Sequence, residues 1–263
     1  MNDVSVFLKV AYDGTSFHGF ARQPGLLTIQ GSLEGSLAVV MGRPVPTTGA
    51  GRTDAGVHAQ GQVVSFLACR SEVPDLVGLV RALDGLTPDS ICVIEARLAG
   101  PLEDARFSAV GRAYRYRISA GGPAPVLSRP FVWRRSRALD LAAMRAGAAI
   151  LAGEHDFRAF CVTPSARGAR TVRTIDRIDV LQEDVAREPV VAIVVEGRSF
   201  LHSMVRIIAG TLADVGRSRR SPADVATALE ACDRAAAGET APAHGLVLEA
   251  VLYDPDMWLQ LGG

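Results

Sequence analysis

GAGRTDAGVHAQGQVVSF, residues Gly49 to Phe66, decides how the chain around it is organised. Four glycines frame Arg52, Asp54 and His58, and the stretch ends in the alternating apolar pattern of a strand. Glycine tolerates a positive φ and the close approach of another backbone. We therefore expect a sharply folded loop that presents charged side chains and leads into a strand over 62–68.

Asp54 at the centre of this stretch has two interpretations. An isolated Asp-Ala-Gly is typical of an Asx turn. A turn, however, does not require Arg52, Thr53 and His58 at fixed spacing around the aspartate. A carboxylate beside an arginine stays ionised and can serve as a nucleophile or a base. The loop is predicted to be catalytic first, with the structural turn as the alternative.

The composition predicts a folded soluble protein with two domains. The chain has 263 residues, of which 48% are hydrophobic and 21% charged, and we expect domains at 1–105 and 106–263. No apolar run reaches the roughly 18–20 residues that span a bilayer, and the first residues do not resemble a signal peptide, so a cytoplasmic protein without a membrane partner is expected. The four cysteines and five histidines are dispersed. No disulfide, metal or cofactor is predicted from them.

The charge distribution favours an anionic partner, although the net charge of the chain is zero. Residues 97–177 carry 15 arginines against 6 acidic residues, while the segments on either side are acidic. Arginine pairs with phosphates in a bidentate manner and stacks on bases. A general preference for arginine, since Lys9 is the only lysine, explains the residue type but not the clustering. We therefore expect an anionic polymer as the partner.

Apolar spacing predicts an α+β fold. Thr28 is the expected N-cap of a helix that buries Ile29, Leu33, Leu37 and Val40, and Gly42 is expected to end it. The segment 153–160 is predicted to be a structural turn that packs its two phenylalanines, 172–197 a hairpin with a long connection, and 163–171 a basic loop for RNA. The remaining expected strands are 4–11, 91–95, 112–118 and 241–253, and the remaining expected helices begin at Pro74 or cover 139–151, 199–215 and 222–232.

The strand 112–118 alternates tyrosine with arginine. Arg112, Tyr114 and Tyr116 fall on one face, and Arg115 and Arg117 on the other. The pattern fits the outer face of an exposed sheet. It also fits a nucleic-acid surface, where aromatic planes stack on bases and guanidinium groups bind phosphates.

Several of these stretches resemble one family, the TruA-type tRNA pseudouridine synthases, which isomerise uridines at positions 38–40 of the tRNA anticodon stem-loop. GRTDAGVHAQGQVVSF is similar to the signature of that family over its whole length, without a gap. Phe20 and Ala21 depart from the first family motif, which has Trp and Gln in their places; phenylalanine lacks the indole N–H and alanine lacks the amide. The other similar stretches are YDGTSFHG (12–19), ARFSA (105–109), FLHSMVRIIAG (200–210) and Gly245-Leu246.

The resemblance implies a site in which Asp54 is the catalytic carboxylate. It implies that Arg206 pairs with Asp54 and keeps it ionised, and that Tyr114 stacks on the uracil and can accept the C5 proton. Whether Asp54 attacks C1′, attacks the ring or removes a sugar proton stays open. Leu246 is expected to form an apolar wall.

The resemblance also implies further contacts to the substrate. Arg52 is expected to take the space of the flipped base or to hold its phosphate, and His58 and Arg112 are expected to bind substrate. The family fold has two α/β domains with mixed, mostly antiparallel sheets that meet in a basic cleft. A homodimer that binds tRNA without cofactor or metal is implied.

Two rival functions remain from the residues themselves. A glycosidase needs two carboxylates, and Asp13 or Asp156 would have to supply the second. A module that only binds RNA would keep the arginines and Tyr114 but would not need Asp54.

Overall fold

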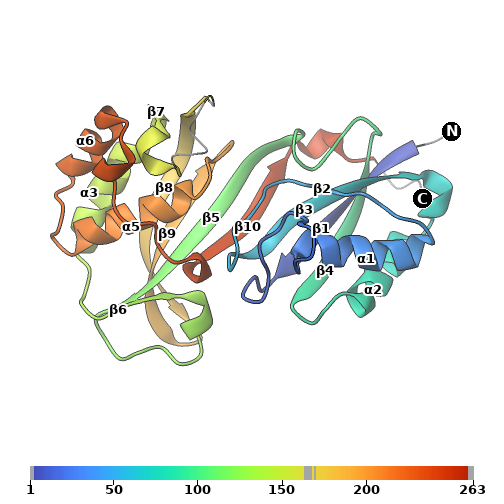
Figure 1. Ribbon diagram of the computed structural model, residues 1–263, viewed down its shortest axis with the longest axis horizontal. Coiled ribbons are helices and arrows are strands. Elements are labelled where there is room, and N and C mark those ends of the chain that lie inside the picture. Colours follow the sequence, from blue (N-terminus) through green and yellow to red (C-terminus); the bar gives the residue numbers. More distant parts are fainter. Residues whose placement is uncertain (1–2, 163–167, 169, 260–263) are drawn as a thin grey trace. The chain divides into compact units, whose positions relative to one another are not determined.

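The structure, a computed structural model, describes residues 3–162, 168 and 170–259 (Figure 1). The chain divides into two compact units: unit 1 is Met1–Val110 with Leu248–Gly263, and unit 2 is Gly111–Val247. Each unit combines mainly antiparallel strands with helices, which confirms the expected α+β fold. The expected domains 1–105 and 106–263 differ from these units, because the C-terminal residues belong to unit 1. Compact units do not by themselves define domains, so the expected domains 1–105 and 106–263 stay a prediction.

Unit 1 is built on a sheet with the strand order β4-β1-β3-β10, and β2 pairs with β3. β1 pairs antiparallel with both β3 and β4. Val6, Phe7 and Leu8 of β1 are each at most 2% exposed, so both faces of this strand are covered. The strands are β1 (Asp3–Tyr12), β2 (Thr48–Gly49), β3 (His58–Cys69), β4 (Ile91–Ala99) and β10 (Leu246–Tyr253), whose first two residues belong to unit 2.

The helices of unit 1 are α1 (Ile29–Met41) and α2 (Leu76–Leu86), which pack against each other (Figure 1). The predicted ends of α1 are confirmed: the Thr28 side chain accepts a hydrogen bond from the N–H of Gly31, and Gly42 has a φ of 65°. The predicted start of α2 at Pro74 is wrong. The Asp75 side chain caps the helix by accepting from the N–H of Val77, so the helix begins at Leu76, two residues after Pro74. Short 3₁₀ segments at Arg70–Glu72 and Pro255–Met257 complete the unit.

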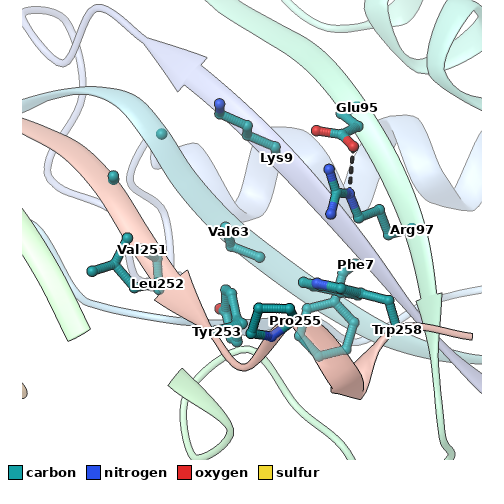
Figure 2. A pocket seen from close by; sticks show the side chains of 12 residues that line it. Phe7, Lys9, Val63, Glu95, Arg97, Val251, Leu252, Tyr253, Pro255 and Trp258 are labelled. Carbon is teal, nitrogen blue, oxygen red and sulfur yellow. Dashed lines mark hydrogen bonds and ion pairs between the residues drawn. The ribbon is translucent and has the colours of Figure 1, made fainter. Parts of the chain in front are cut away.

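The C-terminal segment of unit 1 packs on the sheet face that Phe7 shares. The ring of Phe7 meets those of Tyr253 and Trp258 edge to face, with centroids 5.5 and 5.2 Å away. The Tyr253 hydroxyl donates to the carbonyl of Ala105 at 2.7 Å. Figure 2 shows these rings at one end of a cavity of about 470 Å³. The aromatic cluster therefore holds Tyr253 and Trp258 against β1.

Unit 2 has a sheet in the order β5-β9-β8-β7, and β6 pairs parallel to β5. α3 packs against α5, α6 and β8. The strands are β5 (Ala109–Ala120, beginning in unit 1), β6 (Trp133–Arg135), β7 (Gly153–Asp156), β8 (Val172–Val185) and β9 (Glu188–Gly197). The helices are α3 (Leu141–Leu151), α5 (Met204–Gly216) and α6 (Ala223–Ala231), with 3₁₀ segments at Arg129–Phe131, Phe157–Phe160, Arg234–Ala236 and Ala243–Gly245.

The connection between β8 and β9 is short, not long as the sequence suggested. Only Ala186 and Arg187 separate the strands, with φ values of 52° and 66°. Two residues with positive φ form the turn that matches the twist of a hairpin. The polar run before the turn and Pro189 after it obscured the strand ends, because proline is usually disfavoured in a ladder.

Other boundaries also differ from the predictions. The segment 153–160 was expected to be a turn, but its first half is β7, which pairs with β8; Phe157 and Phe160 are fully buried, as predicted. α5 starts after Ser203, whose φ of 58° interrupts the apolar spacing that suggested a start at residue 199. β10 starts at Leu246 because a 3₁₀ turn precedes it. The basic loop predicted at 163–171 lies mostly outside the described residues.

Candidate active site

The loop that carries Asp54 is held in unit 1 by side chains of two neighbouring strands. The Gln62 side-chain amide donates to the carbonyl of Gly51 at 2.9 Å. The hydroxyls of Tyr12 and Thr53 are 2.8 Å apart and hydrogen bonded. All three of these side chains are buried. Hydrogen bonds from buried side chains therefore hold the loop in place.

Asp54 itself opens a tight turn. The N–H of Val57 donates to the Asp54 carbonyl at 3.1 Å, and Gly56 in the turn has a φ of 77°. Because the main chain closes this turn, the bend does not require a carboxylate at position 54. The Asp54 side chain is half-buried and Arg52 is exposed, which suits a charged group at the edge of a site.

The first family-like motif, YDGTSFHG, lies directly against this loop. A Cβ placed on Gly14 would be 2.0 Å from the carbonyl oxygen of Val57, and one on Gly19 would be 3.0 Å from that of Thr53. The N–H of Phe20 donates to the same Thr53 carbonyl at 3.1 Å. Only glycine allows so close an approach of two backbones. The structure thus joins two motifs that lie far apart in the sequence.

Phe20, which replaces the tryptophan of the family motif, is a packing residue. It is 2% exposed, and its ring occupies the space that a side chain on Gly49 would need, 2.3 Å from the Cβ position. Its centroid is 6.5 Å from that of Tyr12. Phe20 therefore supports the loop by packing against Gly49.

His58 connects the start of β3 to the first motif. Its Nδ1 accepts from the N–H of Gly14 at 3.1 Å and is 3.0 Å from Oδ1 of Asp13. Burial alone would raise the pKa of Asp13, but hydrogen bonds from the side chain and N–H of Thr15, together with His58, bring that pKa below its usual value. The imidazole is 2% exposed. This geometry favours a positioning role for His58.

Tyr114 and Arg112 stand on β5 in unit 2. The Tyr114 ring is half-buried and meets Phe200 edge to face, with centroids 5.2 Å apart. Arg112 is 9% exposed and donates through Nη1 to the carbonyl of Arg198 at 2.6 Å. Both side chains are therefore directed by the segment that leads into α5.

Arg206 is fixed to the segment that leads into β10. Its Nε donates to the carbonyl of Ala241 at 2.8 Å, and the N–H of Ala241 donates back to the Arg206 carbonyl at 3.1 Å. Leu246, five residues further on, is 6% exposed. The first turn of α5 and the approach to Leu246 therefore form one assembly.

Tyr116 is a supporting residue that we did not single out from the sequence. It is fully buried, and its hydroxyl donates to the carbonyl of Pro242 at 2.8 Å. A Cβ on Gly245 would lie 2.7 Å from the Tyr116 ring. Burial raises the pKa of Tyr116 far above its usual value, so the phenol stays a donor. A tyrosine in an expected strand, whose hydroxyl needs a partner once it is buried, was the available signal for both Tyr116 and Tyr12.

The outer face of β5 carries ion pairs. Arg115 and Arg117 both bind Glu183 of β8, with N–O distances of 2.5 and 2.7 Å. The carboxylate thus partly neutralises the two arginines that suggested a phosphate surface. The side chains on this face are therefore held by ion pairs between strands of the same sheet.

The predicted site residues form two groups. Asp54, Arg52 and His58 belong to unit 1. The remaining four, Tyr114, Arg206, Leu246 and Arg112, belong to unit 2. The geometry above is that of each group by itself, and the pairing of Arg206 with Asp54 stays a prediction, as does the basic cleft.

Comparison with known proteins shows the family. The family model described as "tRNA pseudouridine synthase" matches residues 9–108 and 148–254, which leaves Tyr114 between the two matched stretches. The chain belongs to the tRNA pseudouridine synthase family, a family of isomerases.

Curated relatives agree over nearly the whole chain. Proteins named "tRNA pseudouridine synthase A" from Frankia casuarinae and Bacillus subtilis are 46% and 41% identical to it, covering 96% and 93% of this chain and 90% and 97% of the relatives. One from Geobacillus sp. is 40% identical over 93% of this chain and 96% of its own. A solved structure titled "Crystal Structure of a Cbf5-Nop10-Gar1 Complex" matches with a TM-score of 0.31 at 13% identity, over 79% of this chain and 54% of that one, and adds nothing to the assignment.

Two properties of the described residues concern metal ions and membranes. Within them, no cluster of three or more His, Cys, Asp or Glu side chains is arranged to hold a metal ion. No helix in the same part of the chain has the length and hydropathy needed to cross a membrane.

Proposed function

We propose that the chain converts uridine to pseudouridine at positions 38–40 of the tRNA anticodon stem-loop, with Asp54 as the catalytic carboxylate. The observation that carries this proposal is the Asp54 turn, which the main chain closes and the first motif braces. A structural turn alone has no need of this carboxylate. A braced, half-buried carboxylate is what nucleophilic or base catalysis requires.

The reaction rearranges bonds without consuming a reagent. The C1′–N1 bond of uridine breaks, the uracil rotates, and a C1′–C5 bond forms. C5 then loses its proton and N1 gains one, so atoms and charge balance. Asp54 attacks C1′, attacks the ring or removes a sugar proton, and the geometry of unit 1 is compatible with each.

The other residues hold the uracil and the carboxylate. Arg206, fixed by Ala241, pairs with Asp54 and keeps it ionised, because a guanidinium favours a nearby negative charge. Tyr114 stacks on the flipped base and accepts its C5 proton, and Leu246 forms an apolar wall. Arg52 takes the place of the flipped base or holds its phosphate.

His58 and Arg112 support this arrangement, since both are buried and hydrogen bonded to the main chain. In the proposal the protein acts as a homodimer in the cytoplasm, without metal or cofactor. The homodimer rests on the family resemblance.

The rival functions have weaker support. Asp13 accepts hydrogen bonds from the N–H and hydroxyl of Thr15, and Asp156 accepts one from the N–H of Arg158 at the start of a 3₁₀ turn. Each of these carboxylates has a structural role that accounts for it. A glycosidase would therefore lack a second acid with comparable surroundings.

The test is tritium release from tRNA labelled with [5-³H]uridine. Wild type should release tritium, and Asp54→Asn, which keeps the shape but loses the charge, should be at least about 1000-fold slower. Asp89→Asn, at an exposed turn of the same unit, is the matched control and should match wild type. Replacing uridines 38–40 by cytidine in the tRNA should abolish release.

Other outcomes would contradict the proposal in distinct ways. Free uracil among the products would indicate a glycosidase. If wild type and Asp54→Asn bind tRNA equally and neither releases tritium, the chain only binds RNA. Tritium release that persists without uridines 38–40 would show that the target uridine lies elsewhere in the tRNA.

A further inference from the structure

A second charged hollow lies in unit 2, where β6 and the end of α5 meet. The cavity has a volume of about 500 Å³, and all but one of its lining residues are arginines. We call it the arginine pocket. Its lining residues are Arg134, Arg135, Ser136, Arg137, Arg217 and Arg219.

The backbone brings these arginines together from two directions. Arg134 and Arg135 end β6, and Arg137 follows them. Arg217 is the C-cap of α5, and Ser218 after it has a φ of 56°. The left-handed residue bends the chain, so that Arg217 and Arg219 both line the cavity. A helix C-terminus stabilises nearby positive charge, but this effect accounts only for the arginines at the end of α5.

Nearby carboxylates compensate only part of this charge. Glu239 forms a close ion pair with Arg135. Asp214 is 3.9 Å from both Arg217 and Arg219, at the limit of an ion pair. No acidic side chain is among the lining residues. The pocket therefore keeps a positive field.

Two guanidinium nitrogens in the pocket have unused hydrogen-bonding capacity. Nε of Arg135 and Nη1 of Arg217 are buried and have no hydrogen-bond partner within the described part of the chain. Buried donors of this kind are costly unless a partner satisfies them. Burial, and then the charges of Arg135 and Arg219, lower the pKa of Arg217. An anion in the pocket would relieve both effects.

We propose that the arginine pocket binds phosphates of the RNA substrate's backbone, away from the target uridine. This rests on the proposed function for the identity of the RNA. Arg217 lies eleven residues after Arg206, which in a helix corresponds to about 16 Å, so the pocket contacts a different part of the RNA from the catalytic arginine. Arginine forks suit phosphate oxygens. The cavity is larger than one free phosphate needs, and the Arg219 side chain, 63% exposed, stands where a chain can enter.

The test compares charge-removing variants in tRNA binding. R137Q/R219Q alters two exposed side chains and should not affect folding. We expect its dissociation constant for tRNA to rise about 10-fold at low salt and the log–log salt slope to fall by about two, one for each lost phosphate contact. KM should rise with it while kcat stays unchanged. R137K/R219K should restore the salt slope, because lysine keeps the charge.

R81Q/R158Q removes two exposed arginines outside the pocket and serves as the matched control for net charge. A 10-fold loss of affinity in the control as well would overturn the assignment to this pocket. Arg217→Gln provides a second, buried test, with the melting temperature measured in parallel. An unchanged dissociation constant and salt slope in R137Q/R219Q, in a protein that makes pseudouridine, would overturn the proposal.

Three further outcomes separate the alternatives. If inorganic phosphate raises the melting temperature of wild type but not of R137Q/R219Q, while both bind tRNA equally, the pocket takes a small anion and the RNA assignment fails. If the variant loses tRNA affinity but wild type makes no pseudouridine, the proposed function fails and the pocket stands. Absence of tRNA binding by wild type would refute both.

Discussion

The Asp54 loop and strand β5 both carry charged motifs in the sequence, but the surroundings of their charged side chains differ in the structure. In the loop, glycines bring two backbones into contact and the charged residues stand at the edge. On β5, the outward arginines are paired by Glu183, 68 residues beyond Arg115. A glycine pattern constrains the backbone whatever its partner is. Alternation in a strand identifies the residues of one face, but it does not tell what covers that face.

Gly14→Ala tests whether the contact between the two backbones positions the Asp54 turn, and we expect it to have the largest effect. The new Cβ would lie 2.0 Å from the Val57 carbonyl, and the Asp54 turn would have to move to accommodate it. We expect the free energy of unfolding to fall by about 2–4 kcal/mol and kcat to fall at least about 100-fold, measured by denaturant unfolding and tritium release.

Gly35→Ala is the matched control for Gly14→Ala. Nothing lies within 4 Å of a Cβ at Gly35 in α1, so alanine should stabilise the helix by about 0.5–1 kcal/mol. If Gly14→Ala behaved like this control, the first motif would not brace the catalytic loop.

A second prediction concerns the support of the unit 2 residues. Tyr116→Phe removes the donor to the Pro242 carbonyl, which should lower the free energy of unfolding by about 1–3 kcal/mol and kcat/KM by about 10-fold, because the segment between Arg206 and Leu246 loosens. Tyr253→Phe loses a similar bond, 2.7 Å long, to Ala105 in unit 1. It should be as destabilising without changing kcat. Equal kinetic effects of the two variants would argue against a special role for Tyr116.

Some features of the fold and the site could be predicted from the sequence, and others could not. The helix α1, with its Thr28 cap and Gly42 stop, was predictable because the signals are local. The loop of Asp54 was predictable because its glycines and charges are contiguous. The contacts of Tyr116 with Pro242 and of Arg115 with Glu183 were not, because 126 and 68 residues separate the partners.

Glu183→Gln sharpens the interpretation of the outer face of β5. Loss of the carboxylate should lower the free energy of unfolding by about 1 kcal/mol. It should also tighten tRNA binding about 2-fold, because Arg115 and Arg117 lose their neutralising anion. Glu72→Gln, which breaks the exposed pair with Arg43, is the control and should leave tRNA affinity unchanged. Unaltered affinity in Glu183→Gln as well would make this face purely structural.

The smallest expected effect concerns a loop that the sequence showed only as rich in glycine and proline. Glu188, next to the hairpin turn, accepts hydrogen bonds from the hydroxyl and N–H of Ser128 and from the N–H groups of Val126 and Leu127. The Ser128 hydroxyl first, and then these N–H groups, lower the pKa of Glu188 to about 2. Like Glu183, this partner lies far along the chain.

Because the folded pKa of Glu188 is below the unfolded one, its contribution to stability is fully present above the ordinary carboxyl pKa of about 4.3 and is lost as the pH falls toward 2. Wild type should therefore melt higher than Glu188→Gln at pH 6, and the difference should shrink as the pH is lowered from about 4.5 to 2.5. Glu230→Gln, at an exposed position of α6, controls for the general effect of acid. A difference between wild type and Glu188→Gln that stayed constant with pH would mean that ionisation of the carboxylate does not hold the loop.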